Sequence, residues 1–179
     1  NKSNFWALNV LSKIKRRIIH TFKKSVNTDK KFSMYDLESQ KNSVNIKKLI
    51  NQSGIKPDII ILYWVSKFLS AQNIYELEKH TQSKIFWVLM DMAPMTGGCH
   101  YAWDCQGYEN SCEKCPGILS RKHQENAKKN LSFKNKWLTL TKFDIIAGSS
   151  QLIEQANKST LFKNRTIHKV MVGLDPDIF

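Results

Sequence analysis

The sequence has no long apolar run, and this absence argues against a membrane-spanning helix. The longest such run, residues 59–65, has seven residues, whereas a helix that crosses a bilayer requires about 20. The start of the chain also lacks the short apolar core and small-residue cleavage site of a signal peptide. The chain of 179 residues begins with Asn1 rather than Met, which suggests an excised fragment. Its length suits one well-buried domain.

Cysteine is scarce and confined to one place. All four cysteines lie within residues 99–115, so they are not spread along the chain as disulfide staples. This distribution favours a cytoplasmic protein. Internal repeats are absent, and 41% hydrophobic and 24% charged residues are ordinary values for a globular fold.

Positive charge is abundant but uneven. Residues 1–50 contain twelve Lys and Arg against three Asp and Glu, so they carry +9 of the net charge of +13. Within this stretch, residues 4–24 have the pattern of a basic amphipathic helix. Such a helix either lies on an anionic membrane surface, where each Lys or Arg contributes about 1 kcal/mol, or packs on its own domain with a solvated basic face. Charge alone does not distinguish lipid, nucleic acid and acidic substrates as partners.

Short apolar runs alternate with helical patterns along the rest of the chain. Strands are expected at residues 59–64, 85–90, 143–147 and 167–172, and helices at residues 45–52, 66–82 and 150–163. The first run is continuously apolar, as expected for a strand that is buried on both faces of a parallel sheet. Residues 29–42 are expected to form a loop. The alternation predicts an α/β fold with a Rossmann-like open parallel sheet, in which ligands gather at the carboxyl ends of the strands.

Residues 91–117 form a long glycine- and cysteine-bearing segment after the second predicted strand. Adjacent glycines, Gly97 and Gly98, allow the backbone to approach a ligand and expose amide donors to an anion. A plain turn explains the same pair.

The spacing of the four cysteines indicates a structural zinc site. Cys112 and Cys115 have two residues between them, as in a zinc knuckle, and Cys99 and Cys105 complete a set of four ligands. His100 could replace one of them. Packed reduced thiols and one or two disulfides are the alternatives. A zinc ion here would serve to fold the segment rather than to catalyse a reaction.

The same segment resembles the cysteine-bearing insertion in a bacterial subgroup of family 4 glycosyltransferases, which build capsule, exopolysaccharide or O-antigen. Residues 90–101 (MDMAPMTGGCHY), 103–105 (WDC) and 112–116 (CEKCP) carry the resemblance. Weaker similarities lie at residues 58–65, 148–151 and 172–179. The resemblance covers about residues 56–179 and implies the N-terminal, acceptor-side domain of a GT-B enzyme. Residues 1–55 are then a separate basic helical segment.

The resemblance implies retaining transfer of a sugar from a nucleotide sugar to a glycan or lipid-linked acceptor, without a metal for the chemistry. On this basis Asp91 and His100 are the candidate catalytic residues, near the reacting hydroxyl. The candidate substrate-binding residues are Gly97, Gly98, Trp103, Ser149, Ser150 and Gly173. Other interpretations are that Asp91 only caps a turn and that His100 is a packed or zinc-bound histidine. The aromatic residues are expected mainly in the core, namely Trp64, Trp87, Tyr101 and Trp103.

The chain also departs from the family pattern. Met90 stands where members have a histidine, Val172 replaces an asparagine, and no glutamates lie eight residues apart as in the donor site. The donor-binding domain is therefore expected outside this chain, and the fragment alone is expected to be inactive. One alternative is a zinc-knuckle module that binds nucleic acid, which is disfavoured because the basic residues lie far along the sequence from the cysteines. Another is a non-catalytic partner subunit, which Met90 favours.

Overall fold

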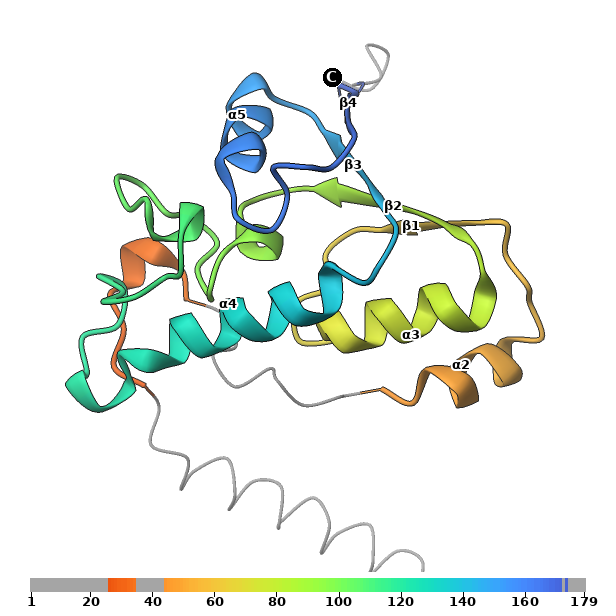
Figure 1. Ribbon diagram of the computed structural model, residues 1–179, viewed down its shortest axis with the longest axis horizontal. Coiled ribbons are helices and arrows are strands. Elements are labelled where there is room, and N and C mark those ends of the chain that lie inside the picture. Colours follow the sequence, from red (N-terminus) through yellow and green to blue (C-terminus); the bar gives the residue numbers. More distant parts are fainter. Residues whose placement is uncertain (1–25, 35–43, 172, 174–179) are drawn as a thin grey trace, which may run out of the picture.

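Among the described residues, four short strands form a single parallel sheet in the order of the sequence (Figure 1). The computed structural model describes residues 26–34, 44–171 and 173. The strands are β1 (Ile59–Leu62), β2 (Lys84–Leu89), β3 (Asp144–Ala147) and β4 (Ile167–Lys169). The α-helices are α2 (Ile46–Ser53), α3 (Ala71–Thr81), α4 (Glu125–Leu138) and α5 (Ser150–Lys158). Short 3-10 helices are η1 (Lys30–Phe32), η2 (Ala93–Met95), η3 (Gly107–Glu109) and η4 (Arg121–His123).

The predicted α/β fold with an open parallel sheet is therefore confirmed. The basic amphipathic helix expected at residues 4–24 lies outside the described residues, as do Val172 and residues 174–179. Residues 30–32, expected within a loop, form the 3-10 helix η1.

Capping residues set the ends of the helices. The side chain of Asn45 caps the start of α2, and Gly54, with a φ of 63°, ends it. The helix lies within one residue of the expected range 45–52 at each end. Helix α3 begins at Ala71 rather than near residue 66, because Ser70 and Asn73 form a capping box there.

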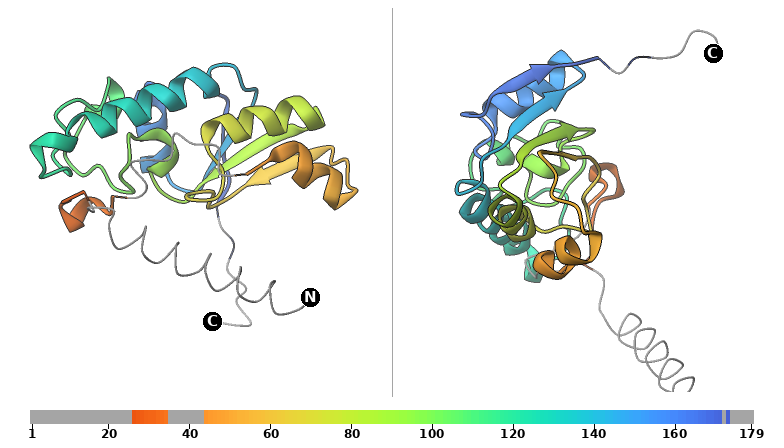
Figure 2. Two further views of the ribbon diagram at one scale, coloured as in Figure 1. Left: turned by 90° about the horizontal axis from the view of Figure 1, so that it is seen from below. Right: turned by 90° about the vertical axis from the view of Figure 1, so that its right-hand side faces the viewer.

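One face of the sheet is buried and the other is open. In β2 the side chains of Ile85, Trp87 and Leu89 are buried, whereas those between them are partly exposed. On the opposite face of β1, Ile59 and Ile61 are 57% and 54% exposed. The prediction that the first strand is buried on both faces is therefore wrong. The sequential strand order with right-handed connections places the connecting helices on one side, and α3 and α4 lie together there (Figures 1 and 2).

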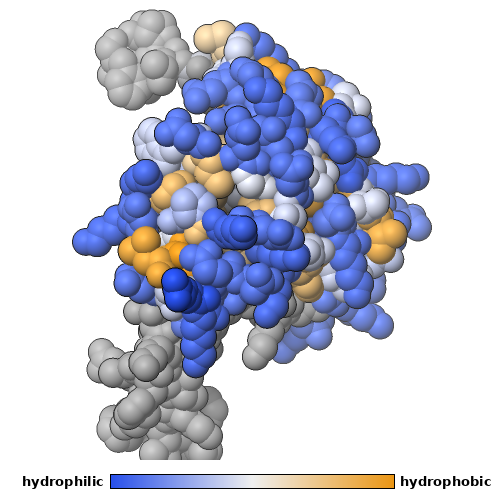
Figure 3. Space-filling model, turned by 60° about the vertical axis from the view of Figure 1, so that its left-hand side comes forward, coloured by the Kyte–Doolittle hydropathy of each residue, from blue (hydrophilic) through white to orange (hydrophobic). Residues whose placement is uncertain are grey.

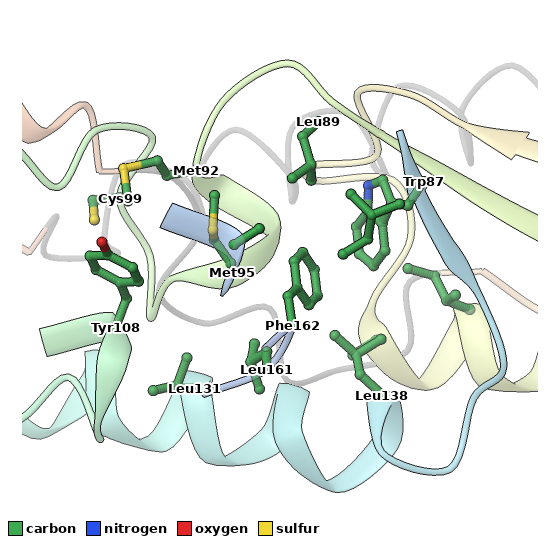
Figure 4. Packing of buried hydrophobic residues seen from close by; sticks show 14 of the residues in the cluster. Trp87, Leu89, Met92, Met95, Cys99, Tyr108, Leu131, Leu138, Leu161 and Phe162 are labelled. Atoms are coloured by element: carbon green, nitrogen blue, oxygen red, sulfur yellow. The ribbon is translucent and has the colours of Figure 1, made fainter. Parts of the chain in front are cut away.

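The core runs from the sheet into the cysteine-bearing segment, residues 91–117. Trp87 packs against Phe162, with ring centroids 5.9 Å apart. Figure 4 shows Met95 between Phe162 and the pair formed by Cys99 and Tyr108, all of which are buried. The segment therefore shares the core of the sheet.

Residues that precede the first strand in the sequence also join this core. Phe32 and Ile46 are both buried, and α2 packs against α3. The domain boundary expected near residue 55 stays a prediction, but the described residues before it pack with those after it.

Candidate functional site

The carboxyl ends of the four strands define one edge of the sheet, which we call the carboxyl edge. Trp64 follows β1, Asp91 follows β2 and Ser149 follows β3. Because neighbouring strands are parallel, the residues that follow them lie along the same edge. The loops expected to gather ligands are therefore neighbours in the fold.

Asp91 and His100 form a hydrogen-bonded pair at this edge. The Nδ1 atom of His100 lies 2.6 Å from Oδ2 of Asp91, and both side chains are largely buried. The other carboxylate oxygen, Oδ1, accepts a 2.7 Å hydrogen bond from the backbone N–H of Ala93. Asp91 therefore caps the turn, as one interpretation of the sequence expected, and also holds His100.

Contacts from three segments fix the position of His100. Its carbonyl accepts a hydrogen bond from the N–H of Met92 at 3.1 Å, and its own N–H donates to the carbonyl of Phe32 at 3.2 Å. The indole of Trp64 stacks on the imidazole, with ring centroids 4.7 Å apart and planes inclined by 10°. Residues far apart in the sequence thus orient one imidazole ring.

Three aromatic residues of this region are exposed, and one of them, Trp64, contacts the pair. Trp64 is 62% exposed, Tyr101 50% and Trp103 63%. The rings of Tyr101 and Trp103 are 6.0 Å apart, and Trp103 Nε1 donates a 2.7 Å hydrogen bond to the carbonyl of Lys31. The expectation that these aromatic residues lie in the core holds only for Trp87, because it alone lies within a strand and faces the helices.

Gly97 and Gly98 are buried beside α4. A Cβ atom on Gly97 would lie 2.4 Å from the carbonyl oxygen of Ala127 and 2.9 Å from the Cβ of Cys112. The side-chain amide of Asn130 donates a 3.0 Å hydrogen bond to the Gly97 carbonyl. Close packing on α4 therefore explains why residue 97 is glycine, and contact of either glycine with substrate stays a prediction.

The other candidate substrate-binding residues lie near the ends of β3 and β4. The Ser149 hydroxyl accepts a 3.2 Å hydrogen bond from the N–H of Leu152 and so caps α5. The Ser150 hydroxyl accepts a 2.9 Å hydrogen bond from Nζ of Lys169. Gly173 is exposed, with open space around it. These residues are accessible, and their roles in binding stay predictions.

The four cysteines surround one small cavity between the segment and α4. Its volume is about 10 Å³, close to the minimum for a single water molecule. Its lining includes Cys99, Cys105, Cys112 and Cys115, which are all free thiols. Burial raises the pKa of Cys99 to about 11 and that of Cys112 to about 12, and it also raises the pKa of Cys115. These thiols are protonated at neutral pH, which disfavours a cysteine nucleophile.

Lys134 of α4 is a candidate that the sequence does not signal. Its side chain is buried, and Nζ donates hydrogen bonds to the carbonyls of Ala93 and Thr96, both at 2.7 Å. Burial lowers its pKa to about 7, while the nearby Cys112, Cys99 and Asp91 act in the opposite direction. In the sequence it is one of several lysines in a helical stretch, and only the packing of α4 shows that it points inward.

A larger hollow of about 490 Å³ lies at the opposite, amino ends of β2 and β3. Its charged side chains include Lys84 and Asp144, which lie 3.3 Å apart, and Lys79 and Glu78, which lie 3.0 Å apart. Since these charges are paired and ligands of parallel sheets gather at the other end, the carboxyl edge is the stronger candidate site.

The surface beside the cysteine-bearing segment is mainly hydrophilic, with small separate apolar patches (Figure 3). Within the described part of the chain, no helix combines the length and apolar character needed to cross a membrane.

Comparisons with protein-family models, with curated proteins and with solved structures find no match for this chain. The resemblance to family 4 glycosyltransferases therefore stays a prediction from the sequence.

Proposed function

We propose that this chain is the acceptor-side part of a retaining glycosyltransferase, which transfers a sugar from a nucleotide sugar to a glycan or lipid-linked acceptor. The hydrogen-bonded pair of Asp91 and His100 at the carboxyl edge carries the proposal. Ligands of open parallel sheets collect at this edge, and a histidine held by a carboxylate is suited to proton transfer. The sequence resemblance supports the same class of enzyme.

In the proposed reaction His100 acts on the acceptor hydroxyl. Oδ2 of Asp91 accepts the proton on Nδ1, so the neutral ring has Nε2 as its basic nitrogen. Nε2 takes the hydroxyl proton as the acceptor oxygen bonds to the anomeric carbon on the same face that the donor phosphate leaves, so the anomeric configuration is retained. The bond between that carbon and the donor phosphate breaks, and the nucleotide leaves with the electron pair. Stacking on Trp64 keeps the imidazole plane in position.

The exposed aromatic residues form the proposed acceptor surface. Trp64, Tyr101 and Trp103 each combine a broad apolar ring with a polar atom, and all three are at least half exposed. A sugar ring has apolar C–H faces and a rim of hydroxyls, so it matches such side chains. The hydrogen bond from Trp103 to the Lys31 carbonyl holds this indole in place.

The donor-binding half is proposed to lie outside this chain. On this view, the exposed Ser149, Ser150 and Gly173 face the donor. The proposed location is the cytoplasmic face of a membrane, with residues 4–24 in contact with anionic lipid.

Replacing His100 with alanine tests the proposal in a protein that contains both halves. We expect His100→Ala to lower kcat for sugar transfer by about 100-fold or more, because proton transfer by a positioned side chain contributes about 10²–10⁴-fold. The assay follows nucleotide release from the donor in the presence of acceptor.

A second histidine provides a matched control. His168 also pairs with an aspartate, Asp144, at 3.1 Å, but it lies on the open face of the sheet. We expect His168→Ala to retain transfer. Unchanged activity in His100→Ala would remove His100 from the mechanism.

Nucleic-acid binding is a second candidate function. Although the basic N-terminal region and the cysteines are far apart in sequence, Lys31 lies against Trp103 in the fold. Exposed aromatic residues beside lysines suit a single-stranded nucleic acid. A salt-sensitive mobility shift with RNA or DNA, without binding to anionic liposomes, would favour this function over sugar transfer.

A non-catalytic partner subunit is a third candidate. Met90 is exposed directly before Asp91, at the position where the resembling family has a histidine. Sugar transfer at the normal rate by the remaining protein without this chain would favour this role.

A further inference from the structure

We propose that Cys99, Cys105, Cys112 and Cys115 bind one structural Zn²⁺ ion and that the buried ammonium of Lys134 offsets the negative charge of this site. The spacing of the cysteines indicates such a site but also allows packed thiols or disulfides. Three features of the fold favour the metal, and the inference is independent of the proposed glycosyltransferase activity.

The first feature is the convergence of all four cysteines on one cavity. The cavity measures about 10 Å³, which is about the space that one water molecule needs. Its remaining walls include small residues, namely Gly97, Gly98, Ala102 and Ala127. Packing alone does not require four thiols to surround the same point, whereas tetrahedral zinc does.

The second feature is a set of backbone N–H groups that donate to the sulfur atoms. The donor and acceptor pairs are Gly107 with Cys105 at 3.4 Å, Gly97 with Cys112, and both Gly117 and Ile118 with Cys115. Hydrogen bonds of this kind favour the thiolate over the thiol. Metal ligands commonly depend on such outer hydrogen bonds for their orientation.

The third feature is the buried amino group of Lys134. A Zn²⁺ ion with four thiolates has a net negative charge, which is costly to bury without compensation. Nζ of Lys134 is held by the carbonyls of Ala93 and Thr96, and its charge interacts with Cys112 and Cys99. A zinc–thiolate cluster therefore gives a reason to bury a lysine at this position.

Binding the ion requires the four thiols to move closer together. No group of three or more His, Cys, Asp or Glu side chains in the described ranges is placed to hold a metal as it stands. In a bound site each sulfur would lie about 2.3 Å from the zinc. Because Cys99 directly precedes His100, the closed cluster would also help to position the imidazole.

Metal analysis tests the proposal on chain 1–179 purified without chelator. We expect about one zinc per chain, with X-ray absorption showing four sulfur neighbours at about 2.3 Å. Less than about half an equivalent of zinc, coordination mainly by nitrogen or oxygen, or disulfides among these cysteines in a metal-free protein would overturn it.

Two lysine variants on the same helix test the role of Lys134. We expect Lys134→Met to weaken zinc affinity about 10- to 100-fold, as other outer contacts of metal sites do. Lys129→Met, on the exposed side of α4, is the matched control and should bind zinc like the wild type. Competition with a chromophoric chelator measures both affinities, and equal values would overturn the proposed charge compensation.

Cys115→Ser provides a separate test of the ligands. We expect it to lose tight zinc binding, and cobalt added in place of zinc should lose its sulfur-to-metal charge-transfer absorption. Tyr108 is buried beside the same cavity, so Tyr108→Phe is the control. It should retain tight zinc binding and the charge-transfer absorption of cobalt. Full zinc binding by Cys115→Ser would overturn the four-cysteine site. None of these readouts depends on sugar transfer.

Discussion

Asp91 uses its two carboxylate oxygens for different purposes. Oδ1 caps the turn at Ala93, and Oδ2 holds His100. The first role depends on neighbouring residues and could be inferred from the position of Asp91 after a strand. The second requires His100 to return beside Asp91, which the hydrogen bond between Met92 and His100 secures. At the scale of single residues, a contact between residues that are not neighbours in the sequence therefore gives a capping aspartate a second role, which is to hold the histidine.

Lys134 is expected to make the stability of the metal-free chain depend on pH. Burial lowers its pKa from 10.5 to about 7, so between these values the unfolded chain binds one more proton than the folded chain. The free energy of unfolding therefore rises with pH in this window. This gain in stability is lost as pH falls towards 7. Between pH 7 and about pH 8.5 we expect the wild type to gain about 1–2 kcal/mol relative to Lys134→Met.

Urea unfolding of both proteins at the two pH values, with a chelator present, measures this difference. The comparison stays below the ordinary cysteine pKa of 9.0, because the raised pKa values of Cys99 and Cys112 lower stability as pH rises above it. If the unfolding free energies of the wild type and of Lys134→Met change equally between the two pH values, Lys134 does not titrate in this range.

At the scale of elements, the cysteine-bearing segment is held between parts of the chain that lie far from it in sequence. Helix α4 packs the Ala127 backbone against Gly97. On the other side, residues 26–34 make isolated bridges that pair Thr28 with Ile118 and Met34 with Cys99. The glycine- and cysteine-bearing segment could be located from the sequence, but its contacts with these distant parts of the chain could not.

Gly97→Ala tests the contact between this segment and α4. The added Cβ would lie 2.4 Å from a backbone oxygen of Ala127, which a side-chain rotation cannot relieve. We expect a loss of about 2–3 kcal/mol in the free energy of unfolding, at the upper end of overpacking costs. Gly148→Ala is the control, since its nearest contact would be an ordinary 3.6 Å. Equal denaturation midpoints for the two variants would mean that the segment does not pack tightly on α4.

At the scale of the whole molecule, the described residues cover only one face of the sheet. Parallel sheets normally have both faces covered, yet Ile59 and Ile61 are more than half exposed. We therefore expect another part of the protein or a partner to cover this face in the functional assembly.

A pair of identical substitutions on opposite faces tests the asymmetry. Ile85 is fully buried and Ile61 is 54% exposed. In chain 1–179 we expect Ile85→Ala to cost about 2–5 kcal/mol in unfolding free energy, and Ile61→Ala less than about 1 kcal/mol. Denaturant unfolding measures both. A similar cost at the two positions would show that the open face is already covered in this chain.

The sequence by itself determined the fold class and the place of the candidate site. Apolar runs of strand length that alternate with helical patterns are local features, and they require a sheet with buried strands. Residues directly after parallel strands, such as Asp91 and Ser149, then lie at the carboxyl edge. The helical pattern at residues 45–52 also predicted α2 to within one residue at each end.

Only the tertiary structure decided which of these side chains are buried and which meet. It exposed Trp64 and Trp103, turned Lys134 inward and left one face of β1 open. It also brought Asp91 to His100 and the cysteines to one cavity. The physical reason is that burial and pairing depend on which distant elements pack against a residue, whereas strand and helix patterns depend on its neighbours in the chain.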